Sequence, residues 1–164
     1  MEKELRKCQH MLVEAGTGII LFAVWNVAKV NLYLGLSLFP TELLHTAAVE
    51  AGVDEKSLAI FTATLVALVM IFQLSVRLYI GLSATGEGKG KNKSWIYLVL
   101  TAVLLITNIR ADWQTFGVER ILAGEKMSVE LITGICMEAA SLYVLLELLI
   151  SGIRVKKLRK QMKV

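Results

Sequence analysis

Four long apolar stretches, separated by short polar segments, dominate the pattern of the chain. They cover approximately residues 11–39, 57–82, 95–112 and 129–153. A helix needs about 20 apolar residues to cross the hydrocarbon core of a bilayer, and each stretch comes near or exceeds that length. The pattern therefore predicts an all-α fold, an integral membrane bundle of four transmembrane helices.

The limits of the first two stretches follow from local signals. The first stretch has no charge between Ala15 and Ala28, and Pro40 ends it because proline disfavours a helical conformation in the preceding residue. Asp54 is a suitable N-cap for the second stretch, which is free of charge as far as Val76. Small residues every fourth position let helices approach closely in lipid. The second stretch has such an edge at Ala59, Ala63 and Ala67.

The segments between the apolar stretches differ in character. Residues 41–51 and 113–124 have helical patterns with one apolar side, so we expect short amphipathic helices in the two outer loops. Residues 84–94 are rich in glycine and lysine, which predicts a flexible loop. Ser128 is a suitable N-cap for the fourth stretch.

Composition supports the membrane assignment. Of the 164 residues, 55% are hydrophobic and 20% are charged, and the mean hydropathy is +0.61. A soluble domain usually has about a quarter of its residues charged. The length of 164 residues predicts one membrane domain, residues 1–164.

The distribution of Lys and Arg predicts the orientation. The N-terminal segment, residues 84–94 and the basic tail 154–164 carry twelve, whereas the other side of the membrane would carry four, namely Lys56, Arg110, Arg120 and Lys126. Cytoplasmic loops are enriched in these residues, so we expect both termini on the cytoplasmic side of the cell membrane. The net charge of +4 arises at membrane edges, which argues against nucleic-acid binding. We expect the tail to contact anionic lipid.

Polar residues within the apolar stretches are the candidates for a functional site. They are expensive in hydrocarbon unless they face a partner, water or the bundle interior. Their depth and helical spacing suggest two groups. An outer pocket would contain Asn26, Lys29, Asn108, Asp112 and Glu138, and an inner cluster would contain Glu14, Gln73, Arg77 and Glu147. A structural alternative stays open, in which Lys29 and Glu138 neutralise each other and the inner charges extend to the headgroups.

Signals of catalysis or of cofactor binding are weak. His10 and His45 fall on opposite sides of the predicted membrane, so they are not a joint metal or haem site. No Ser-His-Asp or Cys-His set is available for nucleophilic catalysis. The glycines of residues 81–86 resemble a phosphate loop in their spacing, but Glu87-Gly88 replaces the required Lys-Ser/Thr pair. We therefore expect no enzyme, no cofactor and no metal.

Two functions remain. The leading hypothesis is that the protein binds or conducts an ion or a small polar solute through the outer pocket. Four helices leave little room for a pore, so conduction would require a homo-oligomer. The competing hypothesis is a non-catalytic accessory or regulatory subunit that docks on a larger membrane complex. Its features would be the alanine edge, the outer amphipathic helices and the basic tail.

Overall fold

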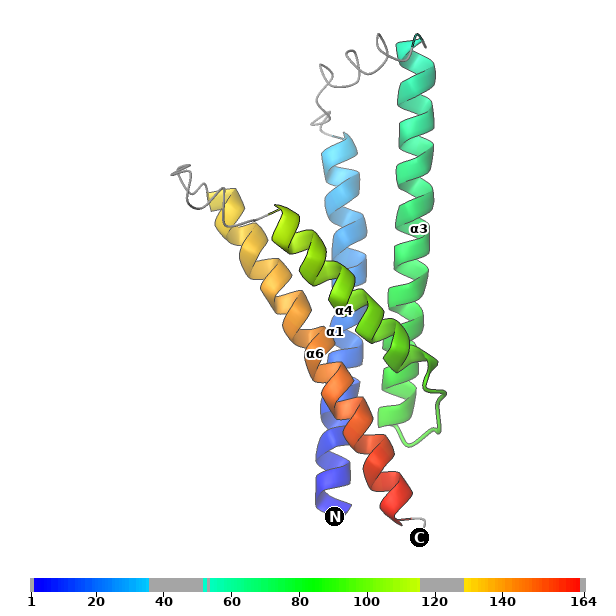
Figure 1. The fold of residues 1–164 in the computed structure, drawn as a ribbon, viewed down its shortest axis with the longest axis vertical. Helices are drawn as coiled ribbons and strands as arrows, with labels where there is room; N and C mark the ends of the chain where they lie inside the picture. Colours follow the sequence, from blue (N-terminus) through cyan, green and yellow to red (C-terminus); the bar gives the residue numbers. More distant parts are fainter. Residues whose placement is uncertain (1, 36–51, 53, 116–128, 163–164) are drawn as a thin grey trace. The chain divides into compact units, whose positions relative to one another are not determined.

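The computed structural model describes residues 2–35, 52, 54–115 and 129–162, and within them it contains four helices and no strand (Figure 1). The helices are α1 (Glu2–Gly35), α3 (Glu55–Gly88), α4 (Ile96–Thr115) and α6 (Val129–Met162). The prediction of an all-α fold is confirmed. The predicted outer-loop helices lie outside the described residues, apart from the first residues of 113–124, which belong to α4.

Three of these helices, α1, α3 and α6, are long and apolar enough to cross a membrane. Each has 34 residues and is therefore about 50 Å long. This exceeds the hydrocarbon thickness of about 30 Å. The fourth, α4, has 20 residues, of which Ile96–Ala111 form a shorter apolar helix.

The helices extend beyond the apolar stretches that predicted them. Helix α1 begins at Glu2, and α6 continues to Met162, so most of the basic tail is helical. Helix α3 continues to Gly88, and the prediction of a loop from residue 84 was wrong for its first five residues, 84–88. The physical reason is packing, because Ala84 and Glu87 are both fully buried and hold this turn against its neighbours.

The chain divides into two compact units. Unit 1 comprises Met1–Ile20 and Leu78–Val164, and unit 2 comprises Leu21–Arg77. The core of unit 1 is formed by apolar side chains of all four helices. Its buried members include Leu12, Ile19, Ile80, Leu98, Leu145, Leu148 and Val155. In unit 2, large apolar side chains of α3 are exposed, among them Ile60, Phe61, Leu68 and Phe72.

Glycines allow α1 and α3 to touch within unit 1. A Cβ on Gly81 would lie 2.7 Å from the carbonyl oxygen of Gly16, and a Cβ on Gly88 would lie 2.7 Å from the carbonyl oxygen of Gln9. Positions 9 and 16 therefore meet 88 and 81 in antiparallel order, about two helical turns apart. The alanine edge that we expected to mediate close packing lies in unit 2, where Ala63 and Ala67 are exposed.

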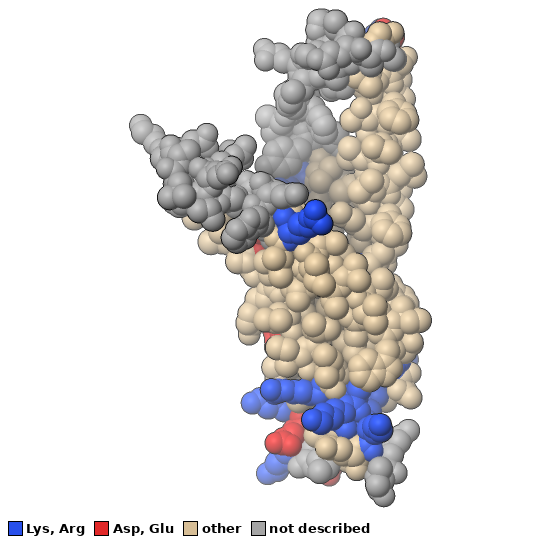
Figure 2. Space-filling view, in the orientation of Figure 1, with Lys and Arg blue, Asp and Glu red and all other residues tan. Residues whose placement is uncertain are grey.

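Both ends of the chain meet at the same end of unit 1. A pocket there is lined by Glu4, Lys7, Cys8 and Met11 of α1 and by Arg154, Lys157, Leu158 and Gln161 of α6. Residues 84–94 reach the same region through contacts of Glu87 with α6. We call this part of unit 1 the basic end, because Lys and Arg side chains gather on it (Figure 2).

Candidate functional site

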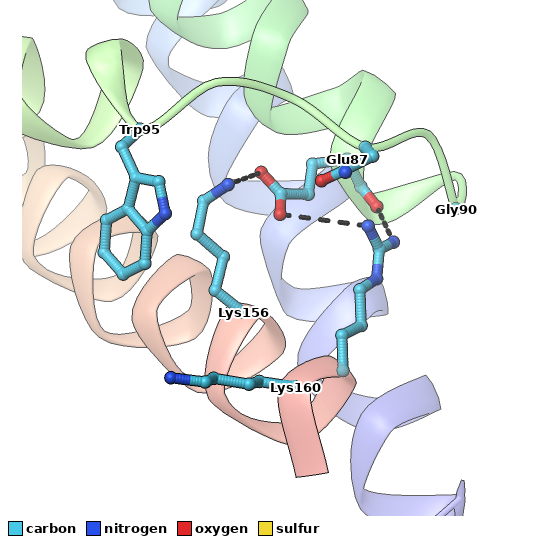
Figure 3. A pocket seen from close by; sticks show the side chains of 7 residues that line it. Glu87, Gly90, Trp95, Lys156 and Lys160 are labelled. Carbon is cyan, nitrogen blue, oxygen red and sulfur yellow. Dashed lines mark hydrogen bonds and ion pairs between the residues drawn. The ribbon is translucent and has the colours of Figure 1, made fainter. Parts of the chain in front are cut away.

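The site at the basic end is built around a buried carboxylate. Glu87 lies in the last turn of α3 and is fully buried. Its Oε2 lies 3.2 Å from Nζ of Lys156, and its Oε1 lies 3.9 Å from Nη1 of Arg159 (Figure 3). The side chains of Lys156 and Arg159 are only 8% and 19% exposed. A charge removed from water is strongly unfavourable unless it is paired, and here one buried acid meets two cations.

The same two cations also hold the backbone that follows α3. Arg159 donates from Nη2 to the carbonyl oxygen of Glu87 at 2.8 Å and from Nη1 to that of Lys91 at 3.1 Å. Lys156 donates to the carbonyl oxygen of Lys93 at 2.6 Å. We call Glu87, Lys156 and Arg159 together the Glu87 clasp. It fastens the α3–α4 connection to the end of α6.

Local sequence explains why these groups meet. Lys156 and Arg159 are three positions apart, so they share one face of α6. Helix α3 ends in a Schellman motif, in which the amide of Lys91 donates to the Gly86 carbonyl and that of Gly90 to the Glu87 carbonyl, each at 3.0 Å. Gly90 has a φ of +93°, a conformation that side-chain-bearing residues rarely adopt. The motif turns the chain so that the carbonyls of residues 91 and 93 face α6.

Aromatic side chains at the start of α4 complete the surroundings of Lys156. Its Nζ lies 5.2 Å from the ring centroid of Trp95 and 5.7 Å from that of Tyr97. Both distances fall within the range of cation–π attraction, about 6 Å. Tyr97 is fully buried, and its hydroxyl oxygen would lie only 3.0 Å from a Cβ on Gly152 of α6. The start of α4 is thus fixed against the same segment of α6 as the end of α3.

A pocket of about 500 Å³ opens beside the Glu87 clasp (Figure 3). It is lined by Glu87, Gly90, Asn92, Trp95, Lys156, Arg159 and Lys160. Three cations and one carboxylate give this lining a net charge of +2. The side chains can hold an anion, but they include no nucleophile paired with a base. Among the residues that the structure describes, no group of three or more His, Cys, Asp or Glu is placed to hold a metal ion.

The residues of the predicted outer pocket are divided between the units. Asn26 and Lys29 belong to unit 2, whereas Asn108 and Glu138 belong to unit 1, and all four are half-buried. The side chain of Asp112 lies outside the described residues. The amide nitrogen of Asn108 is buried and has no hydrogen-bond partner among the described residues. The outer pocket therefore stays a prediction.

The predicted inner cluster is likewise divided. Glu14 and Glu147 belong to unit 1, whereas Gln73 and Arg77 belong to unit 2. Glu14 is exposed, and its Oε1 lies 3.1 Å from Nδ1 of His10 on the same helix. Gln73 is exposed, Glu147 is half-buried and Arg77 is buried. An exposed pair such as His10–Glu14 contributes little to stability, and the inner cluster stays a prediction as well.

Sequence reasoning missed the Glu87 clasp. It treated Glu87 only as a mismatch to a phosphate loop and the lysines around it as orienting charges. The sequence did contain a signal for a buried ion pair. Glu87 is the only acid in the otherwise basic segment 84–94, and the spacing of Lys156 and Arg159 places them on one helix face. A lone acid among cations is a good candidate for a buried pair, although its partner is not evident from local spacing.

Comparison with known proteins identifies no relative of this chain. No protein-family model matches the chain, and neither a curated protein nor a solved structure matches it.

Proposed function

We propose that the protein is a four-crossing membrane protein that binds or conducts an ion or a small polar solute through the membrane interior. Four crossings place both termini on one side, and the meeting of the two chain ends at the basic end of unit 1 supports this arrangement. The excess of Lys and Arg at this end supports a cytoplasmic location for it.

The observation that carries the functional part is an inverted exposure pattern. Asn108 is half-buried, whereas its apolar neighbours Ile106 and Ile109 are 66% and 49% exposed. On α1, Asn26 and Lys29 are half-buried, although Trp25 beside them is exposed. A helix is stable in lipid when its apolar side chains face the lipid and its polar side chains face the interior of the bundle.

The buried amide nitrogen of Asn108 is a second observation in favour of a bound ligand. A buried amide nitrogen without an acceptor costs about 1–3 kcal/mol, which a bound solute or water would offset. Glu138, also half-buried, would supply a negative charge for a cation or an acceptor for a polar solute. Toward the basic end the interior of unit 1 is occupied by buried apolar side chains and by the paired Glu87, so conduction would use a path formed between copies of the chain.

A flux assay in proteoliposomes tests this function. K⁺, Cl⁻ and glycerol are suitable probes, with the intact protein compared against Glu138→Gln and Asn108→Leu. Arg110→Gln is the matched control, because Arg110 is exposed on the same helix as Asn108. The proposal expects flux of at least one probe that both site variants reduce and the control preserves. Absence of flux for all probes, or equal flux in all variants, would contradict it.

A non-catalytic accessory subunit is the second candidate. It is favoured by α3, in which the most apolar part has no buried residue, leaving a long apolar surface for lipid or for a larger complex. The mass of the protein in lipid nanodiscs separates the two candidates. A closed homo-oligomer with flux supports conduction, whereas a monomer without flux supports the accessory role.

A further inference from the structure

We propose that the pocket beside the Glu87 clasp binds the phosphate group of an anionic membrane lipid. This site is separate from the intramembrane pocket of the proposed function. The identification of a lipid, as opposed to soluble phosphate, rests on the proposed membrane topology. The binding of a phosphate group rests on the pocket alone.

The charges of the pocket favour an anion. Its lining carries a net charge of +2, and the single acid, Glu87, is fully buried beneath the two cations that it pairs with. Lys160 is exposed and, among the described residues, forms no ion pair, so its ammonium group is available to a ligand. A phosphate that enters the pocket can therefore pair with the available ammonium group of Lys160 and with the clasp, whose one acid and two cations leave a net charge of +1.

The pocket is also organised in advance. Glu87 and the loop carbonyls fix Lys156 and Arg159, so binding need not immobilise two long side chains. Arg159 uses two terminal nitrogens for backbone carbonyls, but a guanidinium group has five N–H donors and retains some for a phosphate. Asn92 adds an amide donor, and Gly90 has no heavy atom within 4 Å of its Cβ position, which leaves open space at the pocket.

Trp95 indicates the lipid as the source of the phosphate. Trp95 is 57% exposed and lines the pocket, and the amine of Lys156 lies over its ring. Tryptophan is enriched at the membrane–water interface, where lipid phosphates lie. Because α4 begins next to this residue and continues into an apolar segment, the pocket would lie at headgroup level, with Trp95 against the glycerol region of the lipid.

Binding is measured with the full-length protein in phosphatidylcholine nanodiscs. Trp25→Phe and Trp113→Phe leave Trp95 as the only one of the three tryptophans, so its fluorescence reports on the pocket. The probes are dioctanoyl phosphatidic acid, inorganic phosphate and the zwitterionic dioctanoyl phosphatidylcholine, in which choline balances the charge of the phosphate. Phosphatidic acid should shift Trp95 fluorescence saturably, inorganic phosphate should bind more weakly, and the zwitterionic lipid should have no saturable effect.

The site variant is Lys160→Gln and its matched control is Lys157→Gln. Lys157 is also an exposed lysine of α6, but it lines the other pocket at the basic end. Loss of one charged hydrogen bond should weaken phosphatidic acid binding about tenfold in Lys160→Gln, and by less than about twofold in the control. Equal weakening in both variants would overturn the site in favour of diffuse surface charge. Absence of saturable binding would also overturn it.

The two probes distinguish the sources of phosphate. If inorganic phosphate binds as tightly as phosphatidic acid, the lipid assignment is wrong and the ligand is a soluble phosphate. The outcome is independent of conduction, because Lys160→Gln should leave solute flux unchanged. A protein that binds phosphatidic acid without flux would refute only the proposed function.

Discussion

Replacement of Glu87 by glutamine should destabilise the basic end by about 3 kcal/mol. Removal of one member of a buried ion pair costs about 3–5 kcal/mol, because the other member stays buried without compensation. Here Lys156 and Arg159 are 8% and 19% exposed, so both would lose their countercharge in a nearly closed environment. Their bonds to the carbonyls of Glu87, Lys91 and Lys93 persist, which places the expected loss at the lower limit of that range.

The free energy of unfolding can be measured by titration with sodium dodecyl sulfate from mixed micelles, followed by circular dichroism. Glu14→Gln is the matched control, because it removes an exposed acid whose side chain is 64% exposed. Surface substitutions of this kind usually change stability by less than about 0.5 kcal/mol. The double variant Glu87→Gln/Lys156→Met should lose less than the sum of the single variants, since it no longer buries an unpaired lysine.

Two results would refute this reasoning. If Glu87→Gln unfolds with the same free energy as Glu14→Gln, the buried pair does not stabilise the basic end. If the double variant loses the full sum of the two single effects, Glu87 and Lys156 are not coupled. Either outcome would mean that the α3–α4 connection is held by hydrogen bonds and apolar packing alone.

Three further substitutions test separate parts of the structure. Gly81→Ala should lower the thermal unfolding temperature in detergent, because the Cβ of the alanine would lie 2.7 Å from the Gly16 carbonyl oxygen, and backbone atoms cannot move away easily. An unchanged unfolding temperature would rule out this contact between α1 and α3. Gly90→Ala should cost about 1 kcal/mol through its φ of +93° alone, since no heavy atom lies within 4 Å, and a larger loss in the same assay would point to a missing contact. Measured without added solute, Asn108→Leu should raise the unfolding free energy by about 1 kcal/mol, because it removes a buried amide nitrogen without a partner among the described residues. A destabilised variant would show that the amide is paired even without a solute.

The sequence predicted the helices but not their ends. Apolar stretches are a direct consequence of the lipid environment, so their number and approximate position are evident from hydropathy. The polar segments by which α1 extends to Glu2 and α6 extends to Met162 are not apolar, so hydropathy does not reveal them. They are helical because they continue helices already formed and because residues such as Cys8 and Val155 pack in the core of unit 1.

The Glu87 clasp was beyond prediction for a related reason. Glu87 and Arg159 are 72 residues apart, and helical periodicity relates only residues within one helix. The contact depends on where α3 ends, and that end depends on the turn at Gly90. The depth and spacing of polar residues suggested Asn108 and Glu138 as members of an outer pocket; both are half-buried, and the pocket itself stays a prediction.

The most direct test of the account is the side of the membrane on which three positions lie. In a Cys8→Ser/Cys136→Ser background, single cysteines at Lys3, Lys91 and Gln161 can be labelled with a membrane-impermeant maleimide in intact cells and in inverted vesicles. Four crossings with a cytoplasmic basic end predict that all three react in inverted vesicles and none in intact cells. Reaction of position 3 and position 161 from opposite sides would mean an odd number of crossings and would contradict the account.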